Sequence, residues 1–145
     1  MADAKHVSWV RAGAETLARL KGDGLWSRRL DLSDADLRGC DLRDVDIRFA
    51  RLTGARFDES DLRGADLGYA DCDGASFAGC DLRQASLKGA LLEGASFREA
   101  RMLGCDIDEA VIGENDWRGA DRTRAVGEPR SPEPRDKGRE GSDFC

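Results

Sequence analysis

The sequence predicts an all-β solenoid, in which short extended segments form a coil and successive coils stack along one axis. Three regularities favour this fold: an apolar residue recurs every five positions, a small residue precedes it by two positions, and glycine often ends the five-residue unit. A period of five matches neither the 3.6-residue turn of an α-helix nor the two-residue alternation of a strand. A fixed period of this kind is the signature of a repeat architecture.

The apolar column runs from Leu32 to Ile112 in steps of five residues. Its 17 positions hold only Leu, Ile, Phe, Met and, at one position, Cys72. The residue two before each of these centres is small in 15 of the 17 units, with Leu30 and Val45 as the exceptions. The other three residues of a unit are mostly Asp, Arg, Glu and Gly. We therefore expect two alternate residues of each unit to point inward and the rest to face water.

Corners must join these short segments, and a glycine at the end of a unit suits a tight corner. Coils built in this way stack through strand-like hydrogen bonds at about 4.8 Å. With units such as ADLRG, CDLRD, SDLRG and ADLGY, the chain resembles the pentapeptide-repeat family, whose signature is A-(D/N)-L-x-x. The resemblance covers roughly residues 30–120. It implies a right-handed quadrilateral β-helix with four units in each coil of 20 residues, and therefore about four coils with a height of roughly 20 Å.

Residues 20 positions apart should stack if a coil takes four units. One such column holds Phe57, Phe77 and Phe97, with Leu37 below and Trp117 above. Three phenylalanines at this spacing support the four-unit coil independently of the family resemblance.

Segments on either side of the repeat complete the predicted organisation. Residues 1–29 should form a short N-terminal capping helix and a linker, because an apolar stripe over residues 3–21 follows a possible N-cap at Asp3 and ends at Gly22. Residues 30–121 should form the β-helix. Residues 122–145 are charged and contain all three prolines, so we expect a disordered tail.

Neither the cysteines nor the single histidine indicates catalytic or metal chemistry. None of the five cysteines has Cys-x-x-Cys spacing, and Cys40, Cys80 and Cys105 occupy inward small positions, where we expect buried thiols. His6 lies in the predicted capping helix, and the serines have no base partner. We therefore expect no enzyme activity, no cofactor and no metal.

Charge and hydropathy narrow the partners that the chain could bind. The net charge is −6 and the isoelectric point is about 4.9, which argues against direct binding to nucleic acid or to an anionic membrane. No segment approaches the roughly 18 apolar residues of a membrane span, and the N-terminus lacks a signal-peptide pattern. These features predict a cytoplasmic protein.

The first functional hypothesis is a non-catalytic scaffold that binds another protein, whose identity the sequence leaves open. Phe49 and Tyr69 both end a unit and lie 20 residues apart, so they should stack at one corner of the surface. They could anchor a partner or merely shield the corner. Further candidate contacts come from the acidic segment 57–81, which has a net charge of −6: Asp58, Glu59, Asp61, Asp66, Asp71 and Asp73.

The second hypothesis follows from the family resemblance. Some members mimic duplex DNA in shape and charge, bind DNA gyrase or another topoisomerase, and protect it from quinolones or toxins. Residues 30–121 hold 21 acidic and 11 basic residues, a net charge of −10. Stacked Asp and Arg rows such as Asp41 and Arg43 would neutralise each other, however, and the residues after 121 lack the apolar C-terminal element typical of gyrase-binding relatives.

A homodimer is the expected assembly. Apolar residues at outward positions and at the end of the last predicted coil should leave an uncovered surface, which invites two-fold association. The candidate dimer contacts are Leu91, Val111, Ile112 and Trp117. A chain that folds back after Ala120 to seal this end would instead leave a monomer.

Overall fold

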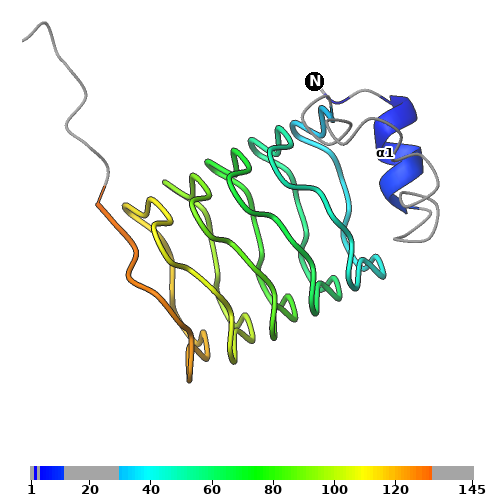
Figure 1. The fold of residues 1–145 in the computed structure, drawn as a ribbon. Helices are drawn as coiled ribbons and strands as arrows, with labels where there is room; N and C mark the ends of the chain where they lie inside the picture. Colours follow the sequence, from blue (N-terminus) through cyan, green and yellow to red (C-terminus); the bar gives the residue numbers. More distant parts are fainter. Residues whose placement is uncertain (1, 3, 12–29, 132–145) are drawn as a thin grey trace, which may run out of the picture.

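A computed structural model describes residues 2, 4–11 and 30–131, and its main element is a solenoid (Figure 1). Parallel bridges join residues that are 20 positions apart, from Asp31 with Arg51 to Asp106 with Val126. Each winding therefore takes four units, as the phenylalanine spacing indicates. Each unit contributes one bridge residue, the one before its centre, so the faces of the solenoid are stacks of single bridges without longer strands.

Backbone hydrogen bonds follow the same repeat in every winding. The N–H of a centre donates to the carbonyl of the residue 19 positions later, as Leu32 does to Arg51 at 2.8 Å. The N–H of Arg51 donates back to the carbonyl of Leu30 at 3.0 Å. Within a unit, the next inward small residue closes the corner, as when the Ala35 N–H donates to the Leu32 carbonyl at 3.0 Å. This pattern satisfies the buried backbone groups without continuous strands.

The core is a narrow column filled by the two inward residues of each unit. All centres from Leu32 to Ile107 are buried, and nearly all the small residues between them are buried as well. The predicted ring column is present: the rings of Phe57, Phe77, Phe97 and Trp117 stack with centroid separations of 5.1, 5.1 and 4.6 Å and lie within 7° of parallel. A regular five-residue repeat can thus bury a core with a modest share of apolar residues, because every buried position recurs in register.

Two expectations about the core need correction. Cys80 and Cys105 are fully buried, but Cys40 is only half-buried. Cys40 belongs to the first winding, so no preceding winding covers it, and its Sγ contacts the Arg38 carbonyl at 3.7 Å. The inward small position guarantees burial only where windings lie on both sides.

The solenoid extends nine residues beyond the predicted end at residue 121. Bridges at Asp121, Val126 and Arg130 complete a fifth winding, so residues 31–130 form five windings of 20 residues and exceed the four that the pattern indicates. The pattern fails in sequence because Arg122 and Gly127 occupy centre positions, yet the backbone ladder does not depend on apolar side chains. The last bridge joins Val111 to Arg130, 19 residues apart, so the final corner is one residue shorter.

Helix α1 spans Ala4–Arg11 and lies at the N-terminal end of the solenoid (Figure 1). Val10 is fully buried against the core. The N–H of Asp31 donates to Nδ1 of His6 at 3.0 Å, and the Arg11 guanidinium donates to the Asp36 carbonyl. These contacts tie α1 to the first winding. The rest of the predicted capping helix, through Gly22, and residues 132–145 of the predicted tail lie outside the described residues.

No helix among the described residues is long and apolar enough to cross a membrane.

Candidate interaction surface

The four faces of the solenoid provide a coordinate system for its surface. Each unit of a winding belongs to one face, and we number the faces 1 to 4 by the centres Leu32, Leu37, Leu42 and Ile47 of the first winding. A face also includes the bridge residue before each centre and the two residues after it. Because the chain passes from face 4 of one winding to face 1 of the next, these two faces share a corner.

Backbone geometry at the corners restricts which residues fit there. The last residue of each regular unit has a positive φ between about 53 and 76°, the left-handed region that glycine adopts without strain. Glycine occupies many of these corner positions, and Asp, Glu, Gln and Arg occupy most of the others. Phe49 (φ 64°) and Tyr69 (φ 58°) are the aromatic residues among them. A bulky side chain in this conformation is a marked exception to backbone preference.

Phe49 and Tyr69 form an exposed stacked pair at the corner of faces 4 and 1, as predicted from their spacing. Their ring centroids lie 5.5 Å apart and the ring planes are 12° from parallel. The side chains are 37% and 47% exposed, in contrast to the fully buried Phe77 ring. Exposed, ordered aromatic rings of this kind are typical anchors of protein interfaces.

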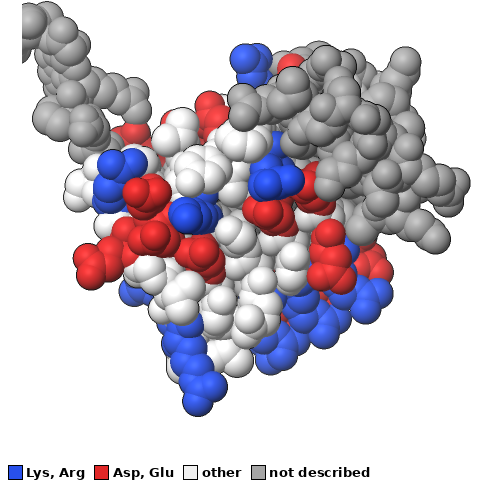
Figure 2. Space-filling model, viewed as in Figure 1, with Lys and Arg blue, Asp and Glu red and all other residues white. Residues whose placement is uncertain are grey.

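Charge is sorted by face rather than by sequence segment. The outward residues of faces 2 and 3 carry ten acidic and ten basic residues between 31 and 129, whereas faces 1 and 4 carry twelve acidic and three basic residues, a net charge of −9. In Figure 2, basic side chains form a row along the lower right edge of the solenoid and acidic side chains gather apart from them. The acids of faces 1 and 4 are Asp31, Asp34, Asp71, Asp73, Glu93, Glu114, Asp46, Asp66, Asp106, Asp108, Glu109 and Glu128.

Faces 2 and 3 neutralise their own charge through local ion pairs. On face 3, Arg43 donates to Asp41 of its own unit at 2.8 Å and lies 3.8 Å from Asp61 of the next winding. Hydrogen bonds from the Arg43 side chain and backbone hold the pKa of Asp41 at about 2. The same arrangement recurs along faces 2 and 3 at Asp36–Arg38, Asp61–Arg63, Asp81–Arg83 and Asp116–Arg118. These faces therefore present little net field.

Faces 4 and 1 lack an equivalent row of pairs. Arg48 pairs with Asp46 at 2.9 Å and approaches Asp66 at 3.5 Å. Asp71 and Asp106 form no ion pair with any described residue and accept backbone N–H groups instead. The corner with the two aromatic rings therefore lies between the two faces that carry the excess negative charge.

The predicted acidic contacts separate into two groups. Asp66 lies on face 4, and Asp71 and Asp73 lie on face 1, so these three flank the Tyr69 corner. The remaining three lie on the other side of the solenoid: Asp58 and Glu59 on face 2 and Asp61 on face 3. The segment 57–81 therefore does not form one acidic patch, because consecutive units turn to different faces.

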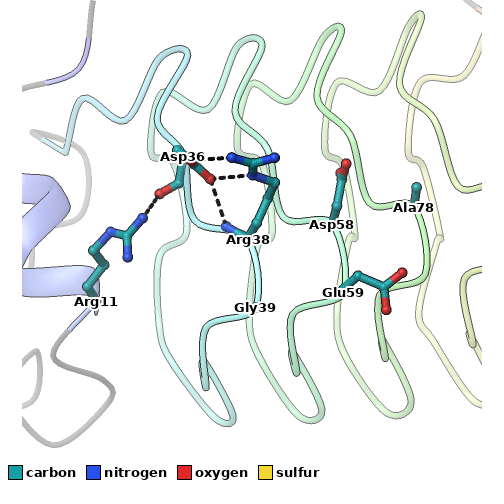
Figure 3. Close-up of a pocket in the computed structure, with 7 residues that line it drawn as sticks. All are labelled: Arg11, Asp36, Arg38, Gly39, Asp58, Glu59 and Ala78. Atoms are coloured by element: carbon teal, nitrogen blue, oxygen red, sulfur yellow. Dashed lines mark hydrogen bonds and ion pairs between the residues drawn. The ribbon is translucent and has the colours of Figure 1, made fainter.

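Asp58 and Glu59 line a shallow hollow of about 580 Å³ on face 2, between α1 and the third winding (Figure 3). The Arg38 guanidinium in this hollow is held by Asp36 through two hydrogen bonds of 2.8 Å. Oδ1 of Asp58 is buried and has no hydrogen-bond partner among the described residues. The hollow thus combines paired and unpaired charges and gives no sign of a catalytic arrangement.

The predicted dimer contacts lie near the C-terminal end. Leu91 and Val111 form a bridge and stack on face 1, with Leu91 40% exposed. Ile112 and Trp117 are partly buried in the fifth winding, and the Arg122 guanidinium lies 4.5 Å from the centre of the Trp117 ring. The end of the solenoid is therefore only partly covered by described residues.

Residues that sequence reasoning missed include Asp106, Asp108 and Glu109, which extend the acidic surface toward the C-terminal windings. Charge was summed there over sequence segments, and the segment after residue 82 begins with a basic stretch. Sorting the same residues by their position within a 20-residue winding places these three on face 4.

Comparison with known sequences agrees with this architecture. The profile of the family described as pentapeptide repeats matches with eight copies over residues 31–68, 55–93 and 75–112. Together these matches cover more than half of the chain. The chain belongs to the pentapeptide-repeat family. A search of curated proteins found no match.

Pentapeptide-repeat proteins are also its structural neighbours. A trypsin-treated form of QnrB1, a plasmid-mediated fluoroquinolone resistance protein, is 25% identical with a TM-score of 0.55, covering 62% of this chain and 46% of QnrB1. A pentapeptide-repeat protein from the thylakoid lumen of Arabidopsis thaliana is 33% identical with a TM-score of 0.39, covering 58% of this chain and 66% of that protein. The chain thus matches less than two thirds of either neighbour. Family members of this kind generally serve structural or interaction roles.

Proposed function

We propose that this protein is a non-catalytic scaffold that binds another protein, and that the Phe49–Tyr69 corner is its contact point. The observation that carries the proposal is the exposed ring pair in left-handed backbone. Such a conformation costs on the order of 1–3 kcal/mol for a non-glycine residue. The rings fill no core position that would offset this cost, whereas a partner that covers them would.

Replacing both rings by glycine tests the proposal. We expect Phe49→Gly with Tyr69→Gly to change the free energy of unfolding by less than about 1 kcal/mol, because relief of backbone strain offsets the lost ring contacts. Capture of a specific partner from cell extract should fall at least about tenfold, as expected when interface anchors are removed. Chemical denaturation and quantitative capture on immobilised protein measure the two effects.

The matched control is Glu59→Gly with Glu99→Gly, which removes two exposed side chains from left-handed corners elsewhere on the solenoid. This control should retain the partner. Equal capture by wild type and the aromatic-deleted variant would refute the proposal. A loss of more than about 2 kcal/mol in that variant would instead assign the rings a shielding role.

A second candidate function is DNA mimicry directed at gyrase or another topoisomerase. The structural likeness to QnrB1 and the charge of −9 on two adjacent faces favour it. The neutralised faces 2 and 3 weigh against it, because a DNA mimic must present negative charge around much of its girth. A gyrase supercoiling assay with a quinolone, with and without this protein, separates the two: protection of the enzyme would favour mimicry.

We also propose that two copies associate through the C-terminal winding. In the earlier windings the centre N–H groups donate to the following winding, but no described winding follows the fifth. Val126 at this end is 52% exposed, and the Leu91–Val111 pair continues the apolar surface. An end-to-end, two-fold contact would cover the same patch on both copies.

Light scattering at micromolar concentration should therefore give the mass of a dimer. Val111→Asp and Leu91→Asp should each shift the mass toward a monomer, because a charge would be buried in the contact. Ser96→Asp places the same charge at the bridge position of the neighbouring face and should leave the dimer intact. A monomeric wild type, or a dimer insensitive to both substitutions, would exclude this contact.

A further inference from the structure

Tyr69 ends the aromatic stack at its corner. The residues stacked along the corner of faces 4 and 1 are Phe49, Tyr69, Gly89 and Glu109. Phe49 covers one side of the Tyr69 ring, while on the other side the ring lies against Gly89, where an added Cβ would collide with it. Gly89 brings no side chain to cover the ring. The next side chain along the corner is the carboxylate of Glu109.

The surroundings of this ring are acidic on both faces. Asp66 precedes Tyr69 by three residues on face 4, and Asp71 follows it by two on face 1. Farther along face 4, Asp106 and Asp108 form no ion pair with described residues and accept backbone N–H groups. The ring is thus half exposed within a field of carboxylates that exceed the cations of the same two faces by nine.

A guanidinium is the group that meets both features. It stacks on an aromatic ring through its planar face and donates a fork of hydrogen bonds to carboxylates. A lysine ammonium matches the carboxylates but stacks less well, because it is compact and strongly hydrated. We propose that the Tyr69 corner and the acidic faces 4 and 1 dock an arginine-rich segment of a partner protein. This proposal rests on the scaffold function and specifies the chemistry of its partner.

The length of the surface sets the size of a suitable probe. Five windings at about 4.8 Å span roughly 19 Å, which about six residues of an extended peptide cover at 3.3 Å per residue. Fluorescein-labelled nona-arginine and nona-lysine are both long enough. They carry the same number of charged side chains and differ in the group that would meet the ring.

Fluorescence anisotropy at low salt tests the proposal with these peptides. Wild-type protein should bind nona-arginine about two- to five-fold more tightly than nona-lysine, the range expected for an exposed cation–π contact. Tyr69→Leu, which keeps apolar bulk without the ring, should abolish that preference and leave nona-lysine affinity unchanged. Equal affinities for the two peptides, or a preference that survives Tyr69→Leu, would overturn the proposal.

Charge variants identify the faces involved. Asp106→Asn with Asp108→Asn should weaken both peptides several-fold, because two carboxylates without ion pairs are lost. Asp61→Asn with Asp81→Asn removes the same charge from face 3, where each carboxylate has an arginine partner, and should weaken them less. Equal losses would show that only net charge matters and would contradict docking on face 4. If these tests fail while the aromatic-deleted variant still loses its captured partner, the scaffold function stands and its partner is not arginine-rich.

Discussion

Replacing Phe77 by alanine should lower the free energy of unfolding by about 3–5 kcal/mol, measured by chemical denaturation. The Phe77 ring is fully buried and stacks on Phe57 and Phe97 at 5.1 Å on both sides. Alanine would leave a cavity in a column only one side chain wide. Neighbouring windings cannot close it easily, because their spacing is fixed by backbone hydrogen bonds above and below.

Phe49→Ala is the matched control, since it removes the same ring from a stacked pair on the surface. It should cost less than about 1 kcal/mol, because the Phe49 side chain is partly exposed. A loss below about 1 kcal/mol at Phe77, or equal losses at the two positions, would contradict the assignment of the buried column.

The buried thiols should react with a thiol reagent at least about a thousandfold more slowly in the folded protein than after unfolding. Burial raises the pKa of the Cys105 thiol to about 12 and raises the pKa of Cys72 and Cys80 well above the ordinary value. Nearby carboxylates such as Asp71 add to the shift at Cys72. Because the thiolate is the nucleophile, few of these groups are reactive near pH 8.

Titration with a chromogenic disulfide before and after denaturation measures this difference. A Cys145→Ser background removes the cysteine outside the described residues, leaving the half-buried Cys40 as the faster native thiol. Native labelling of all four remaining cysteines at one fast rate would contradict their inward positions.

The fold could be predicted almost entirely from sequence, because each buried position recurs in register and errors in one unit are corrected by its neighbours. The end of the solenoid could not: Arg122 and Gly127 break the side-chain pattern, while the backbone ladder continues to Arg130. The aromatic corner was predictable from the 20-residue spacing of Phe49 and Tyr69. The grouping of acidic contacts was not, because charge had to be sorted by face.

The 20-residue winding also determines which changes of length the surface tolerates. Inserting or deleting one five-residue unit would preserve the stacked backbone but turn every later unit by a quarter of a revolution. Glu109 would then leave the Tyr69 corner, and the acidic rows of faces 4 and 1 would be split between different sides. Only additions or losses of whole windings would leave the surface pattern in place, so the architecture permits growth in height far more readily than growth by single units.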